Sequence, residues 1–141
     1  MHCAFCDIVD GRTFVHTVLD EDFVLGFLDA RPVFKGHTLL VPRQHVDTLL
    51  DLPDELHATL LGAAQRLAAA VVESLGAQGS FVAMNNVVSQ SVPHLHVHVV
   101  PRTRGDGLRG FFWPRTKYAS EQESVEYAAR IAGALAPAPG A

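Results

Sequence analysis

The chain has 141 residues, 48% of them hydrophobic, which suits one ordinary core but not two full domains. A formal charge of −4 excludes a broad basic surface, so polymeric nucleic acid and anionic membranes are not expected partners. No basic stretch followed by an apolar run opens the sequence, and no segment reaches the length of a membrane-spanning helix. We therefore expect one soluble, cytoplasmic domain over residues 1–136 and a flexible tail over residues 137–141.

The only two cysteines, Cys3 and Cys6, form one C-x-x-C motif at the start of the chain. Such a pair cannot tie together distant parts of a secreted fold, so a disulfide framework is not expected. A thioredoxin-like redox pair would open a helix after a strand, and almost no sequence precedes these cysteines. Zinc binding is therefore the leading interpretation of the motif.

The first half of the chain predicts three strands and a long helix. Two β-rich runs, 15–19 and 23–28, flank an acidic turn as in a hairpin, and a third run, 37–41, is closed by a proline. A helix is expected from Asp51, as its capping residue, to Gly76. Its buried face carries leucine and valine at helical spacing: Leu56, Leu60, Leu67 and Val71.

The second half predicts two more strands, 81–88 and 95–100, separated by a polar turn. A C-terminal helix follows a capping box formed by Ser120 and Glu123, and it is expected to pack through Val125, Ala128, Ile131 and Leu135. Strands joined mostly by hairpins, together with two helices, predict an α+β domain around an antiparallel sheet. Such a sheet has open edges, which suit pairing with a second copy.

The most informative segment is His94-Leu95-His96-Val97-His98-Val99-Val100. Side chains alternate across a strand, so the three histidines would share one face while Leu95, Val97 and Val99 enter the core. A plain polar face explains one histidine easily and three in succession poorly. Zinc bound by His-x-His is a second alternative. However, the Cα atoms of His94 and His98 would lie roughly 13 Å apart, which makes convergence of all three rings on one ion awkward.

A row of imidazoles suits a phosphate chain better than a single ion. A neutral imidazole is nucleophilic near pH 7, and a hydrogen bond from one ring nitrogen fixes the other as the attacking lone pair. The central ring, that of His96, would attack phosphorus, while one neighbour donates to phosphate oxygens and the other anchors the array. Histidine donors and backbone amides can offset the developing charge, so no divalent ion is required in principle.

The pattern H-φ-H-φ-H-φ-φ at residues 94–100 resembles the signature of the histidine-triad (HIT) proteins, and the similarity extends over nearly the whole chain. It includes the segments Cys3–Gly11, Phe27–Asp29, Gly36–His45 and Gln90–Val92. The resemblance implies a HIT-like α+β fold, with a five-stranded antiparallel sheet, two main helices, and continuation of the sheet across a homodimer. It also implies one site per subunit for a purine nucleotide.

The resemblance also implies roles for individual residues. His96 matches the nucleophile, while His98, Gln90 and Ser91 match the groups around the phosphate and leaving group, and His94 completes the catalytic triad. Asp29 matches the residue that holds the ribose, and Asn85 a strand asparagine that reaches the site. Phe5, Ile8 and Phe27 match the apolar clamp on the base, with core packing as the alternative. The link between Asn85 and Gln90 is shorter than is usual in the family and lacks glycine.

Members with an N-terminal Cys-x-x-Cys resemble related uridylyltransferases in which zinc is bound beside the active strand. By this resemblance the ligands are Cys3, Cys6, His45 and His94, and four ligands with no open position describe a structural zinc. The alternative is two free thiols and a surface histidine.

The leading hypothesis is an enzyme that cleaves the α-phosphorus bond of nucleoside 5′-phosphate derivatives through a nucleotidyl-histidine intermediate. Dinucleoside polyphosphates, nucleoside phosphoramidates and adenylylated compounds all fit it. One alternative is a zinc-dependent hydrolase with the triad as metal ligands, and another is a non-catalytic nucleotide-binding module.

Overall fold

A computed structural model of the chain describes residues 2–108, 114–138 and 140. They belong to two compact units, the first ending at Asp106 and the second beginning at Gly107. The first unit contains the sheet and every candidate site residue. The expected domain, 1–136, spans both units, and residues 139 and 141 of the expected tail lie outside the described part of the chain.

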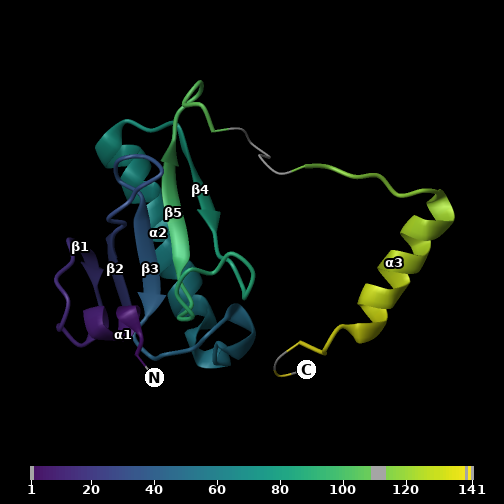
Figure 1. Cartoon of the computed structure of the whole chain (residues 1–141), viewed down its shortest axis with the longest axis horizontal. Coiled ribbons are helices and arrows are strands. Elements are labelled where there is room, and N and C mark those ends of the chain that lie inside the picture. The colour runs from purple at the N-terminus through teal and green to yellow at the C-terminus, as the bar shows by residue number, and fades with distance from the viewer. Residues whose placement is uncertain (1, 109–113, 139, 141) are drawn as a thin grey trace. The chain divides into compact units, whose positions relative to one another are not determined.

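The first unit is built around a five-stranded antiparallel sheet (Figure 1). Its strands are β1 (Thr17–Asp20), β2 (Val24–Leu28), β3 (Thr38–Pro42), β4 (Gly79–Ala83) and β5 (Val97–Arg102). They lie in the order β1-β2-β3-β5-β4, and every neighbouring pair is antiparallel. The α+β class and the five-stranded antiparallel sheet are therefore confirmed. The edges of the sheet are β1 and β4.

The two faces of the sheet bury different side chains because alternate residues of a strand point in opposite directions. One face packs on α2 (His57–Leu75) through Val24, Leu40, Val97 and Val99. Figure 1 shows α2 running along this face. The other face carries Leu25, Phe27, Leu39 and Val41, which pack with Phe5 of the short helix α1 (Ala4–Val9). His98 is paired with Leu39 across β3 and β5, so it lies on the α1 face.

The long helix ends where the sequence predicts, at the left-handed Gly76, but it begins at His57, five residues later than a cap at Asp51 predicts. Asp51 does not cap this helix, because it belongs to a capping box in the preceding 3-10 turn: the Thr48 side chain accepts from the Leu50 N–H, and the Asp51 carboxylate accepts from the Thr48 N–H. The residue before α2 is Leu56, which offers no side-chain cap. The chain then makes two 3-10 turns, η1 (Leu49–Asp51) and η2 (Asp54–Leu56), before α2. The expected cap at Asp51 was wrong because this residue belongs to the preceding turn.

Two predicted strands also have other bounds than expected: β4 is shorter, whereas β5 has the expected length but begins two residues later. β4 ends at Ala83 because the following segment turns, with Val87 at φ 70° and Ser89 at φ 62°, in the left-handed region. β5 begins at Val97 because the Leu95 N–H bonds to the Val46 carbonyl, 2.8 Å away, and not to β3. His94 and His96 therefore lie in the loop that leads into β5.

The second unit contains α3 (Glu121–Ala134) as the one helix among its described residues. The predicted N-cap is confirmed, because Ser120 Oγ accepts from the Glu123 N–H. The Glu123 side chain accepts from the Ala119 N–H and not from that of Ser120, so the second bond of the capping box is displaced by one residue. The side chains expected to pack in a core, Val125, Ala128, Ile131 and Leu135, are exposed. The described residues of this unit contain no second helix or strand that could cover the apolar face of α3. Across the described residues, we find no helix with the length and apolar character needed to span a bilayer.

Candidate active site and metal cluster

The three histidines of the triad lie on the α1 face of the sheet. His94 and His96 are buried, and His98 is partly exposed. The rings of His96 and His98 contact each other, with centroids 5.0 Å apart, and Phe5 contacts His94 and His96 with its ring edge-on. Leu95, Val97 and Val99 are buried on the opposite side, as the alternation predicted.

The hydrogen bond of His96 determines which of its nitrogens can react. Its Nδ1 lies 2.8 Å from the carbonyl of His94, which can only accept, so Nδ1 carries the proton. The neutral ring then has its lone pair on Nε2. This is the arrangement that a histidine nucleophile requires.

His98 has the opposite arrangement because of a chain of hydrogen bonds that begins at a backbone amide. The Val33 N–H donates to His37 Nδ1 at 3.1 Å, so His37 carries its proton on Nε2. His37 Nε2 in turn donates to His98 Nδ1 at 3.0 Å. His98 must therefore carry its proton on Nε2, where the described residues offer it no acceptor. This N–H is available to a ligand.

Burial favours the neutral form of the His37 and His98 rings. It lowers the pKa of His37, with the Asp29 carboxylate opposing the shift. Burial also lowers the pKa of His98 to about 4, assisted by the positive charges that His96 and His37 would carry. His98 is therefore a neutral hydrogen-bond donor at pH 7.

Asp29, the expected ribose ligand, lies just after β2 beside this chain. One of its oxygens accepts from the Arg31 N–H at 2.8 Å, and the other lies 3.7 Å from His37 Nδ1. The side chain is 23% exposed, so a ligand can reach it. Phe5 and Phe27 are buried and contact each other edge-to-face, while Ile8 is partly exposed. The expected base clamp is thus mostly continuous with the core of the α1 face.

The loop between β4 and β5 brings in the expected phosphate-side residues. Gln90 bridges two segments: its Oε1 accepts from the Val87 N–H at 3.0 Å, and its Nε2 donates to the Asp47 carbonyl at 2.6 Å. Asn85 and Ser91 are exposed and make no side-chain hydrogen bond within the described residues. The neighbouring Asn86 instead anchors the loop by accepting from the Leu49 N–H.

Four side chains converge at the N-terminal side of the triad. The ligand atoms of Cys3, Cys6, His45 and His94 all lie within 4.8 Å of one another, and we call this group the metal cluster. Sulfur and nitrogen atoms are separated by 3.3 to 3.6 Å, and the two Nδ1 atoms by 3.2 Å. A tetrahedral zinc ion with usual bond lengths holds sulfur and nitrogen about 3.6 Å apart and two nitrogens about 3.4 Å apart. The cluster therefore matches a zinc site in both donor set and size.

The second nitrogen of each ring in the metal cluster is also correctly placed. His94 Nε2 donates to the Pro42 carbonyl and His45 Nε2 donates to Asp47, both at 2.8 Å. Each Nδ1 consequently presents a lone pair to the thiols, as a metal ligand must. Partial burial and the Cys3 side chain raise the pKa of Cys6 to about 11, a shift that a bound cation would reverse.

The sequence profile of the HIT domain matches residues 14–105, which hold the whole sheet and the triad. The chain belongs to the HIT family. It is 31% identical to the adenosine 5′-monophosphoramidase hnt1 of Schizosaccharomyces pombe, over 86% of this chain and 90% of that protein. Among solved structures, a HIT family member from Bacillus subtilis matches with a TM-score of 0.87 at 30% identity, covering 98% of this chain and 100% of that one. A zinc-bound histidine triad family protein from Mycobacterium smegmatis matches with a TM-score of 0.73 at 36% identity, covering 96% and 99%.

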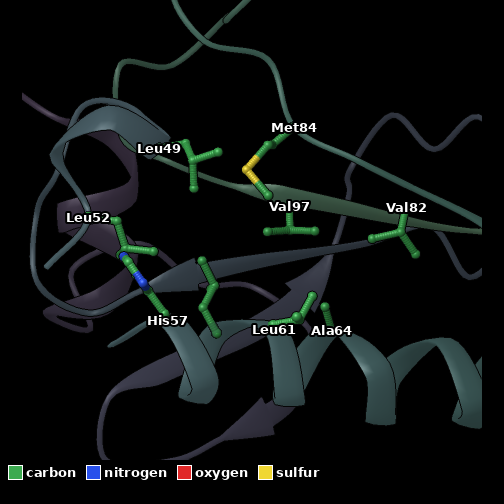
Figure 2. Close-up of a pocket in the computed structure, with 9 residues that line it drawn as sticks. Leu49, Leu52, His57, Leu61, Ala64, Val82, Met84 and Val97 are labelled. Carbon is green, nitrogen blue, oxygen red and sulfur yellow. The ribbon is translucent and has the colours of Figure 1, made fainter. Parts of the chain in front are cut away.

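An apolar pocket of about 420 Å³ lies on the other face of this HIT domain. It is lined by residues of η1, α2, β4 and β5: Leu49, Leu52, His57, Leu60, Leu61, Ala64, Val82, Met84 and Val97 (Figure 2). Val97 enters it from β5, whereas the adjacent His96 and His98 point to the α1 face. The pocket offers one polar ring, that of His57, so it is not the site of phosphate chemistry.

Sequence reasoning missed the residues that set the histidine tautomers. The sequence pattern assigned no role to His37, to the Val33 amide or to the Asp47 carboxylate. The spacing His45-x-Asp47 was a usable signal, since metal-binding histidines usually donate to a carboxylate or carbonyl. The Val33 amide left no signal, because backbone donors are not visible in side-chain patterns.

Proposed function

We propose that this HIT protein cleaves the α-phosphorus bond of nucleoside 5′-phosphate derivatives through a covalent adduct on His96. One observation carries the proposal: a nitrogen lone pair on His96 and an N–H donor on His98 belong to adjacent rings whose centroids are 5.0 Å apart. A nucleophile beside a fixed donor is what displacement at a phosphoryl group requires. The nucleotide-hydrolase class is also supported by the phosphoramidase relative.

In the first step, His96 Nε2 forms a bond to the α-phosphorus while the bond to the leaving group breaks and its electron pair departs with that group. The Nδ1 proton stays on the ring, held by the His94 carbonyl as the ring becomes positively charged. The His98 N–H donates to an oxygen of the phosphoryl group or leaving group. In the second step, water or another acceptor attacks phosphorus, the bond to His96 breaks, and the proton lost by the attacking group passes to solvent.

The remaining expected residues would bind the substrate. Asp29 would hold the ribose hydroxyls with its exposed oxygen, and Phe5, Ile8 and Phe27 would contact a purine base. Gln90 and Ser91 would bind the phosphate side, and Asn85, exposed in the same loop two residues after β4, would also reach it. Dinucleoside polyphosphates, nucleoside phosphoramidates and adenylylated compounds share the phosphoryl group that this arrangement suits.

We also propose one structural zinc per subunit, held by Cys3, Cys6, His45 and His94. When bound, zinc would supply a fixed cross-link that keeps α1 beside the loop leading into β5. Among the described residues, two groups of side chains are arranged so that they could hold a metal ion, and neither contains His96. This favours a metal that supports the site over one bound by the triad.

The partner we propose is a second copy of the chain, paired along β4 so that the sheet continues. β4 is an edge strand, and Val82 on it is 43% exposed. Next to it, the apolar pocket is bordered by Leu61, which is 72% exposed. Sedimentation at micromolar protein should show a dimer, and Leu61→Glu should shift it toward the monomer. A strictly monomeric wild type would exclude this assembly.

The direct test of the reaction is to trap the adduct. Enzyme quenched during turnover of an adenylyl substrate should carry one acid-labile nucleotidyl group on the peptide that contains His96. Turnover that persists in a strong chelator would count against a metal-dependent reaction at the triad. Tight AMP binding without turnover of any adenylyl or guanylyl compound would instead indicate a binding module and overturn the proposal.

A further inference from the structure

One loop, residues 45–49, contacts both the metal cluster and the phosphate side of the site. His45 belongs to the cluster, and its Nε2 donates to the Asp47 carboxylate at 2.8 Å. The Asp47 carbonyl accepts from Gln90 at 2.6 Å. Between these residues, the Val46 carbonyl accepts from the Leu95 N–H, which lies between His94 and His96. The same short segment thus contacts the metal cluster, the loop that contains His96, and the side chain of Gln90.

We propose that Asp47 is a positioning residue that couples zinc binding to nucleotide binding. Its carboxylate orients His45 toward the metal, and its backbone carbonyl holds the Gln90 side chain. This inference rests on the proposed nucleotide site and adds a role for the metal within it. Zinc bound at His45 would hold residue 47, and through it Gln90, in the position that receives the phosphate.

The coupling is expected to pass through His45 because its surroundings differ from those of His94. The His94 ring is buried and donates to a carbonyl of β3, a strand in the middle of the sheet. The His45 side chain is 40% exposed and its carboxylate partner is 64% exposed. His45 is consequently the ligand whose orientation depends most on one side chain outside the core. Coupling between two sites is reciprocal, so nucleotide should also strengthen zinc binding.

The first measurement is zinc affinity, by competition with a chromophoric chelator on the full chain. Asp47→Ala should weaken zinc binding about 10- to 100-fold, which is the usual effect of losing such a partner. Asp47→Asn should restore most of the affinity, because its amide oxygen still accepts from His45. Asp54→Ala is a matched control: Asp54 also lies beside a surface histidine, His57, at 3.7 Å, with similar exposure, but outside the cluster. Unchanged zinc affinity in Asp47→Ala would overturn the positioning role.

The second measurement is the affinity for AMP, by calorimetry with and without zinc. Zinc should tighten AMP binding to the wild type by about fivefold or more, within the usual range of coupling between sites. In Asp47→Ala at saturating zinc, AMP affinity should fall to that of the zinc-free wild type. If the zinc-free protein does not stay folded, the same factor can be measured as the gain in zinc affinity on adding AMP.

The outcomes separate this inference from the proposed function. AMP binding that is tight and independent of zinc overturns the coupling and leaves the nucleotide site intact. Absence of AMP binding in both forms overturns the nucleotide site, and the coupling with it. A zinc effect on AMP binding that is equal in wild type and Asp47→Ala assigns the coupling to another residue and overturns the role of Asp47.

Discussion

Two groups of histidines lie next to each other on the α1 face: His45 and His94 of the metal cluster, and the pair His96 and His98, which we call the catalytic pair. They differ in the partners of their ring nitrogens, and among these four rings only His96 carries its proton on Nδ1. In the metal cluster, His45 and His94 donate from Nε2 and direct Nδ1 toward the thiols. In the catalytic pair, His96 donates from Nδ1 and keeps a lone pair on Nε2, while His98 accepts on Nδ1. The partner of one ring nitrogen thus decides whether a histidine is prepared to act as a ligand, a nucleophile or a donor.

His94 connects the two groups, because its ring belongs to the metal cluster and its backbone carbonyl binds His96 of the catalytic pair. Its ring lies among the thiols, with Nδ1 3.5 Å from Cys3 Sγ, whereas its carbonyl accepts the His96 proton. A metal held by the cluster would therefore fix the acceptor that orients the nucleophile without contacting the nucleophile. The comparison predicts that losses in the catalytic pair affect the rate, whereas losses in the metal cluster affect stability.

The largest effect should come from the nucleophile. His96→Asn removes the one ring lone pair of the catalytic pair that accepts no hydrogen bond from the described residues, so kcat should fall by about 1,000-fold or more, while AMP binding survives on the other contacts. Steady-state kinetics and calorimetry on the same preparation measure the two quantities. If the variant keeps more than about a tenth of the wild-type kcat, a loss under roughly 1.4 kcal/mol, nucleophilic catalysis by His96 is wrong.

Loss of the metal should have a smaller effect on turnover and should mainly lower the stability of the fold. Cys3→Ser removes one ligand of the cluster, and at zinc concentrations 1,000-fold above Kd the lost stabilisation is about 4 kcal/mol. Thermal unfolding should show the loss, while turnover should fall by much less. Adding a chelator should destabilise the wild type and leave the variant unchanged. A wild type that contains no zinc and is fully active would contradict both the site and the comparison.

The affinity for AMP, a ligand that is not cleaved, should depend on Asp29. Asp29→Ala should weaken AMP binding by about 1 to 3 kcal/mol, because charge-assisted hydrogen bonds to the ribose hydroxyls are lost. Adenine base alone should bind the variant and the wild type equally, which serves as the control. An unchanged AMP affinity would show that this carboxylate does not hold the ribose.

The fold could be predicted largely from side-chain periodicity. Alternation around Leu95, Val97 and Val99 identified the buried side of β5, and helical spacing identified the buried face of α2. The ends of elements were less predictable because tertiary hydrogen bonds decide them. The Leu95 N–H donates to the Val46 carbonyl, so β5 begins only at Val97. Asp51 forms a capping box with Thr48 in the 3-10 turn η1, so it does not cap α2.

The residues of the metal cluster could be predicted from the sequence, but the groups that hydrogen-bond to the second ring nitrogen of each histidine could not. Cys3, Cys6, His45 and His94 came from the resemblance, and the structure brings all four together. The groups that fix their tautomers are backbone carbonyls, a backbone amide and one loop carboxylate. Their positions depend on the path of loops, which no periodic pattern describes. The expected catalytic and nucleotide-binding roles, those of His96 and Asp29 included, stay predictions.

The smallest effect concerns the pH dependence of stability that comes from His37 and His98. Burial lowers the pKa of His37 and lowers that of His98 to about 4, whereas an unfolded histidine titrates near 6.5. Between about pH 6.5 and 4 the unfolded chain therefore binds protons that the folded chain does not, and the free energy of unfolding falls as the pH falls. Above that window both states are neutral and these rings contribute no slope.

Urea unfolding across this window, with chelator present to remove any contribution from zinc, isolates the effect. His37→Gln should flatten the dependence, because it removes one buried ring and frees His98 Nδ1 to accept a proton. His57→Gln is the control, since the His57 side chain is 50% exposed and lies outside the catalytic pair. Its curve should run parallel to that of the wild type. If His37→Gln is also parallel, the two rings are not held neutral by the fold, and the distinction between the donor His98 and the nucleophile His96 loses its basis.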